Sequence, residues 1–283
     1  MSRWRRRLVL TGIVTVMFGG IILNRLFVIP DRAKLSATGS EVEAQCRVYP
    51  SGLAIDTDKS LTLAVWNIYK QQKRGWNKTL STLADVSQLM LLQEAQGKPG
   101  MRTWVRTNEW HHDQAYAFSF ANQVAGVMTL SRQLPREACA YLTTEPLLRL
   151  PKSAVKTVYP LSDGRLLSVV NIHAVNFTMG TEEYQEQLDT LIEAVMYFEG
   201  PIIIAGDFNS WSISRTRIMN EKMGSLGLKQ VGFEPENDHR LRVFGFPLDH
   251  IYYRGLLLDG ADVVETHTSD HSPMVVRFRI PPN

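Results

Sequence analysis

The stretch "GPIIIAGDFNSW", residues 200–211, joins a short β-strand pattern to an ending of polar side chains. Four apolar residues, Ile202 to Ala205, run directly into a glycine, an aspartate and an asparagine. Short runs rich in isoleucine favour a buried strand. Because side chains alternate along a strand, Asp207 and Asn209 point to the same side if strand geometry continues through them. The stretch therefore predicts a carboxylate and an amide together at the end of a strand.

Five other segments repeat this pattern of a β-rich run with polar residues at one end. Taken singly, each polar residue has an ordinary interpretation, such as a turn-forming aspartate or a buried core histidine. If these strands end at one rim of stacked sheets, however, the polar side chains converge there. The segments are "LTLAVWNIYK" (61–70) with Asn67, "LMLLQEA" (89–95) with Glu94, "LLSVVNIHAV" (166–175) with Asn171 and His173, "PLDHIYYR" (247–254) with Asp249, and "TSDHSPMVVRFRI" (268–280) with Asp270 and His271.

Helical patterns lie between some of these segments. Residues 182–199 carry apolar side chains at helical spacing after Thr181, a plausible N-cap, and before Gly200. Weaker helical patterns cover residues 76–88 and 212–226. The mixture of many short strands with a few helices predicts an α+β fold in which helices cover sheets.

The first thirty residues differ in composition from the rest of the chain. Four arginines within residues 3–7 precede residues 8–23, which carry no charge. Sixteen helical residues span about 24 Å, and Arg25 can snorkel so that the apolar span extends to residue 29. We therefore predict a membrane anchor in residues 8–29, with the body of the protein on the non-cytoplasmic side. A cleaved signal peptide and a buried arm of a cytoplasmic protein are the alternatives.

Residues 31–60 contain scattered serine, glycine and aspartate, and are predicted to form a linker to a domain spanning residues 61–281. Five of the 31 basic residues lie in residues 1–30, which leaves 26 against 28 acids in the remainder. The body therefore has no bulk positive charge with which to bind nucleic acid. Cys46 and Cys139 are expected to be two ordinary thiols, with a single disulfide bond as the alternative.

The motifs "WN", "QE", "NIH", "GDFN" and "SDH", in that order, resemble the endonuclease/exonuclease/phosphatase superfamily. Its members include DNase I-like nucleases, abasic-site endonucleases, inositol polyphosphate phosphatases and neutral sphingomyelinases. The resemblance covers roughly residues 61–280, and "VWNIYKQQ" and "VNIHAVNF" are most similar to small bacterial YafD-like proteins. It implies a four-layered α/β sandwich, in which two packed mixed β-sheets are flanked by helices.

The resemblance also implies a divalent cation, Mg²⁺ or alternatively Mn²⁺. Hydrolysis of a phosphodiester needs a nucleophilic water and neutralisation of phosphate charge, which a hard cation with oxygen ligands supplies. By resemblance, Glu94 is the principal metal ligand and Asn67 lies close to the metal. Asp270 serves either the metal or the attacking water.

The remaining motif residues receive catalytic roles from the same resemblance. Asp207 is the base that activates water, and Asn209 holds the phosphate or the nucleophile. His271 stabilises phosphoryl charge and is paired with Asp249, which orients the imidazole and raises its pKa. His173 contacts the phosphate from the other side, and by the same resemblance it also stabilises phosphoryl charge.

One position departs from the family pattern. Many relatives carry a tyrosine or glutamate where this chain has Val124, and that side chain supports the first histidine or the phosphate. The partner of His173 is therefore left open by the sequence.

These residues predict a metal-dependent phosphodiester hydrolase, with a nuclease as the first interpretation. A phosphoesterase that acts on a lipid head group or on another small phosphorylated compound is the alternative, and a non-catalytic binding module is the least favoured. Basic and aromatic side chains near the predicted rim are candidates for gripping a nucleic acid. They are Lys70, Lys73, Arg74, Trp76, Trp211, Arg215 and Arg217.

Overall fold

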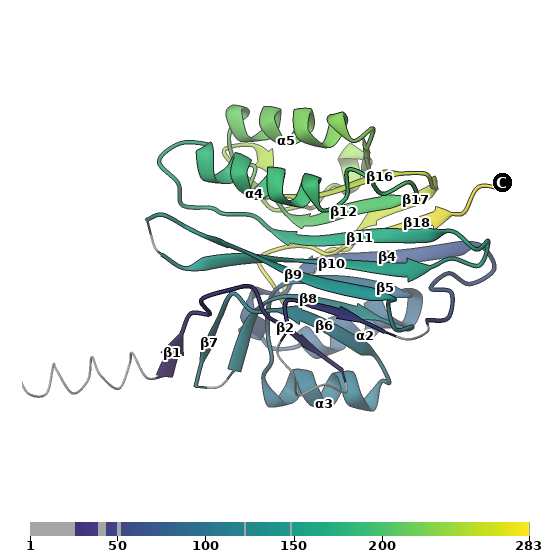
Figure 1. Cartoon of the computed structure of the whole chain (residues 1–283), viewed down its shortest axis with the longest axis horizontal. Coiled ribbons are helices and arrows are strands. Elements are labelled where there is room, and N and C mark those ends of the chain that lie inside the picture. The colour runs from purple at the N-terminus through teal and green to yellow at the C-terminus, as the bar shows by residue number, and fades with distance from the viewer. Residues whose placement is uncertain (1–25, 39–43, 50–51, 122, 148, 283) are drawn as a thin grey trace, which may run out of the picture.

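Two large β-sheets pack face to face, and helices cover the outer face of each sheet (Figure 1). The computed structural model describes residues 26–38, 44–49, 52–121, 123–147 and 149–282. Helices α2 (Trp76–Val86) and α3 (Pro99–Thr107) lie on one side, and α4 (Glu182–Glu193) and α5 (Ile213–Ser225) lie on the other. The predicted α+β class and the four-layered sandwich are confirmed.

The first sheet is mixed, because β4 and β5 are parallel whereas its other pairs are antiparallel. Its order is β1-β7-β8-β5-β4-β18-β17, and β6 pairs with both β8 and β2. The strands are β1 (Phe27–Val28), β2 (Leu35–Ala37), β4 (Ser60–Asn67), β5 (Leu89–Gln96), β6 (His111–Ala115), β7 (Phe118–Phe120), β8 (Gln123–Ser131), β17 (Leu257–Val263) and β18 (Met274–Arg279).

The second sheet is also mixed, with β11 and β12 as its parallel pair. Its order is β13-β16-β12-β11-β10-β9-β3. The strands are β3 (Cys46–Val48), β9 (Glu137–Thr144), β10 (Pro151–Pro160), β11 (Leu166–His173), β12 (Ile202–Asp207), β13 (Lys229–Gln230) and β16 (Asp249–Arg254). Three smaller elements, η1 (Tyr69–Gln71), η2 (Pro235–Asn237) and the hairpin of β14 (Arg242–Val243) and β15 (Phe246–Pro247), complete the described part of the chain.

The alternation of side chains along the strands places the largest core between the two sheets. Val65 of β4, Val169 of β11 and Ile203 of β12 belong to this inter-sheet cluster, and all are buried. Residues at even positions, such as Ile204, pack instead under the helices. The odd-numbered residues that end these strands therefore face the gap between the sheets, which is where polar side chains replace the apolar ones.

Residues 31–60 were expected to be a linker, but their described parts contribute to both sheets. Strand β2 pairs with β6, and β3 pairs with β9. Within the second pair Cys46 lies directly opposite Cys139, and the two sulfurs are bonded. The expectation of two free thiols is wrong because strands 93 residues apart in the sequence become neighbours only in the folded sheet.

The predicted anchor falls mainly on residues 1–25, which lie outside the described part of the chain. Of its last residues, Phe27 and Val28 form β1, which pairs with β7. No helix within the described residues is long and apolar enough to cross a membrane. The anchor therefore stays a prediction.

Candidate active site

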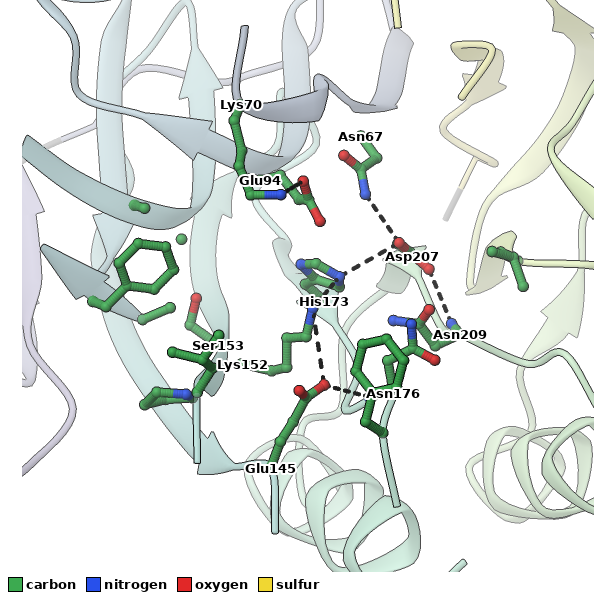
Figure 2. Close-up of a pocket in the computed structure, with 18 of the residues that line it drawn as sticks. Asn67, Lys70, Glu94, Glu145, Lys152, Ser153, His173, Asn176, Asp207 and Asn209 are labelled. Carbon is green, nitrogen blue, oxygen red and sulfur yellow. Dashed lines mark hydrogen bonds and ion pairs between the residues drawn. The ribbon is translucent and has the colours of Figure 1, made fainter. Parts of the chain in front are cut away.

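A cavity of about 430 Å³ opens at the end of the gap between the two sheets. Asn67, His173 and Asp207 line it, and each is the last residue of its strand, β4, β11 or β12. Figure 2 shows their side chains pointing toward one another. The predicted convergence of polar strand ends therefore occurs, and it creates a pocket.

Asp207 lies at the centre of this group. It is opposite His173 in the parallel β11–β12 pair and opposite Asp249 in the antiparallel β12–β16 pair. The Asn67 side chain donates to one carboxylate oxygen at 3.0 Å, and the Asn209 backbone N–H donates to the other at 3.0 Å. Burial raises the pKa of Asp207 to about 6, although the nearby His271 opposes that rise. The carboxylate is thus held in one orientation and accepts a proton near neutral pH.

The backbone around Asp207 requires an unusual conformation. Gly206 has a φ of +144°, and a Cβ there would lie 2.0 Å from the carbonyl oxygen of Ile172. Only glycine fits at this position. Asn209 also has a positive φ, 46°, and its side-chain amide donates to the carbonyl of Ala174 at 2.8 Å. Asn209 therefore braces the loop after β12, and its predicted contact with phosphate stays a prediction.

His271 is bonded to a carboxylate, as its motif predicts. Its Nδ1 lies 2.7 Å from Oδ2 of Asp249, and its Nε2 lies 3.9 Å from Oδ2 of Asp207. Burial alone would lower the pKa of His271, but the carboxylates of Asp249, Asp207 and Asp270, with Asp249 contributing most, together raise the pKa to about 10. His271 is consequently a buried cation on one side of Asp207.

His173 has a different partner, which the sequence does not reveal. The Nζ of Lys152 lies 2.9 Å from His173 Nε2, and that Nε2 lies 3.5 Å from Oδ2 of Asp207. An ammonium group only donates, so Nε2 accepts and the ring proton lies on Nδ1. Burial, together with the charge of Lys152, holds the pKa of His173 well below its usual range. The positive charge on this side therefore belongs to Lys152.

Glu145 completes the His173 side of the pocket. Its carboxylate lies 3.9 Å from Lys152 Nζ and accepts a hydrogen bond from the backbone N–H of Asn176 at 2.6 Å (Figure 2). Val124, the position that departs from the expected family pattern, is not among the residues that line this pocket. Sequence reasoning missed Glu145 and Lys152 because they lie in and beside a hairpin with no motif of its own.

Glu94 approaches the pocket from the opposite sheet. The register between β5 and β8 shifts between Leu92 and Ala95, and Glu94 has a φ of 53°. This irregularity interrupts the alternation of the strand, and Glu94 lines the pocket. Its carboxylate forms an ion pair with Lys70 (Figure 2).

The oxygen-bearing residues predicted to bind a cation fit that role. Glu94, Asn67 and Asp270 all line the pocket, and Mg²⁺ prefers such oxygen ligands. The Lys70 ammonium beside Glu94 shows that this position accommodates positive charge. The residues present therefore fit a divalent cation, and its binding to this group stays a prediction.

A second cluster also has the composition of a metal site. Asp207, Asp249 and His271 each offer a ligand atom, and these atoms lie within 4.8 Å of one another. Asp249 Oδ1 is buried and has no hydrogen-bond partner among the described residues. However, His271 Nδ1 already contacts Asp249, so this cluster works first as a hydrogen-bonded pair beside a base.

Other polar residues singled out by the sequence have structural contacts. Asn171 is buried between the sheets, where its Oδ1 accepts from Gln93 at 2.7 Å. Most of the side chains predicted to grip nucleic acid are likewise engaged within the protein. Lys70 pairs with Glu94, Lys73 donates to the Ser269 carbonyl, Trp76 packs against the core under α2, Trp211 donates to Asn176, and Arg215 is buried and donates to the Val175, Asn176 and Asn209 carbonyls.

Comparison with known proteins shows which sequences and which folds this chain is similar to. The sequence model of the endonuclease/exonuclease/phosphatase family matches residues 64–271. A UPF0294 protein of Vibrio cholerae is 45% identical over 258 residues, which cover 90% of this chain and 92% of that protein.

Two solved structures have a similar fold. ANGEL2, described as a 2',3'-cyclic phosphatase, superposes with a TM-score of 0.64 and 15% identity, covering 78% of this chain and 95% of that chain. TDP2 of D. rerio, complexed with a single-strand DNA product, gives a TM-score of 0.56 and 15% identity, covering 78% of this chain and 100% of that chain. At such identities the likeness establishes the fold alone.

Proposed function

The chain belongs to the endonuclease/exonuclease/phosphatase family, and from that premise we propose that it is a divalent-metal-dependent phosphodiester hydrolase. The observation that carries the proposal is the buried Asp207 carboxylate, flanked by His173 and by His271 with its carboxylate partner. The described activity of ANGEL2 and the DNA product bound to TDP2 are consistent with chemistry on phosphate esters.

In the proposed reaction Asp207 accepts a proton from the attacking water. Two hydrogen bonds, from Asn67 and from the Asn209 backbone, leave the carboxylate little freedom to turn away. The positive charges of His271 and Lys152 stabilise the phosphoryl oxygens as negative charge develops on them. A divalent cation held by Glu94, Asn67 and Asp270 would neutralise phosphate charge. Water adds at phosphorus, one P–O ester bond breaks, and the products are a phosphomonoester and an alcohol.

The test uses a soluble chromogenic diester, bis(4-nitrophenyl) phosphate, and the purified full chain. We expect turnover with Mg²⁺ or Mn²⁺, none with EDTA, and a loss of about 10²- to 10⁴-fold in Asp207→Asn. Asp259→Asn is the matched control, since this carboxylate is exposed and paired with Arg279 away from the pocket. Equal turnover in EDTA, or in Asp207→Asn, would overturn the proposal, and no turnover at all would favour a binding module.

The predicted nucleic-acid substrate stays a prediction. The DNA product in TDP2 supports it. Against it, most of the side chains that were to grip a phosphate backbone contact other parts of the protein. The substrate class is therefore better inferred from the surface around the pocket.

We also propose that the domain works on the non-cytoplasmic side of a membrane, held there by the part of the predicted anchor that precedes β1. The Cys46–Cys139 bond supports this location, because disulfides persist in oxidising compartments. Fractionation of cells with a carbonate wash, followed by alkylation of thiols, tests both parts. Full recovery in the soluble fraction with two alkylated cysteines would instead support the cytoplasmic alternative.

A further inference from the structure

Exposed apolar side chains lie on three segments at one end of the molecule, which we call the three loops: the β1–β7 pair, the β9–β10 turn and the β11–α4 loop. Strands β1 and β7, the β9–β10 turn and the β11–α4 loop all project from the same end in Figure 1. They carry the exposed side chains Val28, Phe120, Leu147, Phe177 and Met179, of which Met179 is 90% exposed. Groups of exposed apolar side chains mark surfaces that contact a partner.

The same three loops form the mouth of the active-site pocket. Phe118 of β7, Leu150 of the β9–β10 turn and Phe177 of the β11–α4 loop line the cavity. Phe118 is also stacked on Phe27 of β1, with ring centroids 5.2 Å apart. A partner that covers the exposed side chains would therefore lie directly over the pocket.

The predicted anchor reaches the body of the protein at this mouth. The apolar segment of residues 8–23 precedes Phe27 by only a few residues. An extended chain advances at most about 3.6 Å per residue, so Phe27 lies about 7 Å along the chain from Arg25. An anchor that ends at residue 25 thus leaves β1, and the pocket beside it, close to the membrane surface.

The charges on these loops fit a lipid surface better than a nucleic acid. Among residues 26–30, 116–121, 145–147, 149–150 and 174–181, the only aspartate, glutamate, lysine or arginine residues are Glu145 and Arg149, and Glu145 is buried. Proteins that bind a phosphate backbone need several basic side chains along it. Apolar side chains on loops, by contrast, insert between lipid head groups.

We propose that these loops rest on a lipid bilayer and that the pocket hydrolyses the phosphodiester of a membrane glycerophospholipid. The inference rests on the proposed phosphodiester hydrolase and names its substrate class. Water adds at the lipid phosphorus and one of its two ester P–O bonds breaks. One proton of the water passes to Asp207, and the departing oxygen leaves as an alcohol once protonated.

The experiment compares two substrates on one preparation of the full chain in vesicles of phosphatidylethanolamine and phosphatidylglycerol. Lipid cleavage is followed by mass spectrometry, and bis(4-nitrophenyl) phosphate is followed by absorbance. In the double variant Leu147→Asp and Met179→Asp we expect the ratio of lipid turnover to soluble turnover to fall at least tenfold. Val48→Asp is the matched control, with an exposed side chain opposite Glu137 at the other end of β9, and its ratio should not change.

A second readout measures contact with the bilayer without chemistry. Tryptophan introduced as Met179→Trp should be quenched by brominated acyl chains, whereas Val48→Trp should not be. Equal quenching at the two positions would overturn the docking surface, even if the vesicle assay fails for lack of activity.

The outcomes separate the two proposals. No turnover of any substrate removes the hydrolase and its lipid substrate together. Turnover of the soluble diester without lipid cleavage, or a ratio that the double variant leaves unchanged, overturns only the lipid inference. Cleavage of single-stranded DNA that depends on Leu147 and Met179, with lipids left intact, assigns the surface to nucleic acid and also overturns it.

Discussion

His271 and His173 lie on either side of Asp207 and differ in the charge of their second partner. His271 contacts the Asp249 carboxylate, whereas His173 contacts the Lys152 ammonium. Both imidazoles are buried, and burial alone would lower the pKa of each. Carboxylates, Asp249 foremost, reverse that effect on the pKa of His271, and the Lys152 ammonium reinforces it for His173.

The difference shows that a histidine in a strand-end motif does not define its own role. The sequence assigns phosphoryl charge stabilisation to both histidines. In the structure His271 carries the positive charge that this role needs, whereas on the other side the positive charge is that of Lys152, whose ammonium donates to His173. Each side of Asp207 nevertheless carries one cation, His271 on one side and Lys152 on the other.

The largest expected effect comes from the His271 side. In Asp249→Asn, His271 loses the carboxylate that keeps it protonated, and we expect kcat to fall about 10²- to 10³-fold. The alkaline limb of the kcat profile should also move to lower pH, because the pKa of His271 falls. The assay is bis(4-nitrophenyl) phosphate turnover from pH 5 to 10.5, with Asp259→Asn as the control. An alkaline limb that stays in place would show that Asp249 does not set the charge of His271.

A smaller effect is expected on the His173 side. Lys152→Met removes one charge-assisted contact to the phosphate, which corresponds to a loss of about 10- to 100-fold in kcat/KM. Because the charge of Lys152 also lowers the pKa of Asp207, the acid limb should move to higher pH.

The matched control for this change is Lys156→Met on the same strand, where the lysine is paired with Glu137 instead of His173. We expect its turnover and its pH profile to match those of the unmodified protein. If Lys152→Met moves the alkaline limb and leaves the acid limb in place, the two sides of the site are not independent.

The smallest effect is that of pH on the unmodified protein. The base must be deprotonated, and the pKa of Asp207 is raised to about 6, so kcat/KM should rise about tenfold between pH 5 and pH 7. It should fall again as pH rises through about 10, where His271 loses its proton. A profile that is flat from pH 5 to 7 would remove Asp207 as the titrating base.

The direction of the side chains at the strand ends was predictable, because the alternation of side chains between the two faces of a strand continues from the core into the site. Val65 leads to Asn67 and Ala205 leads to Asp207, so the residues that follow a buried inter-sheet face inherit its direction. The N-terminal strands were not predictable. Strands of two or three residues are too short to show a pattern, and the Cys46–Cys139 bond depends on a pairing made only in the folded sheet.

Within the site, the residues without a motif could not be found from the sequence. Lys152 is the second residue of β10 and reaches His173 on the neighbouring strand, a contact that depends on the register between the two strands. Glu94, predicted to be the principal metal ligand, lines the pocket, but the shift of register that brings it there is a property of the β5–β8 pairing. Sequence reasoning therefore identified the side chains that belong to motifs, including the Asp249–His271 pair, and missed Lys152 and Glu145 on the His173 side.

The short strands β1, β2 and β3 also limit self-association of the protein through its sheet edges. They cover the free edges of β7, β6 and β9, respectively. An uncovered edge offers unpaired N–H and C=O groups to the edge of another chain. A truncated domain that begins at residue 61 would keep every pocket residue described above, yet it would expose three edges on which self-association can begin.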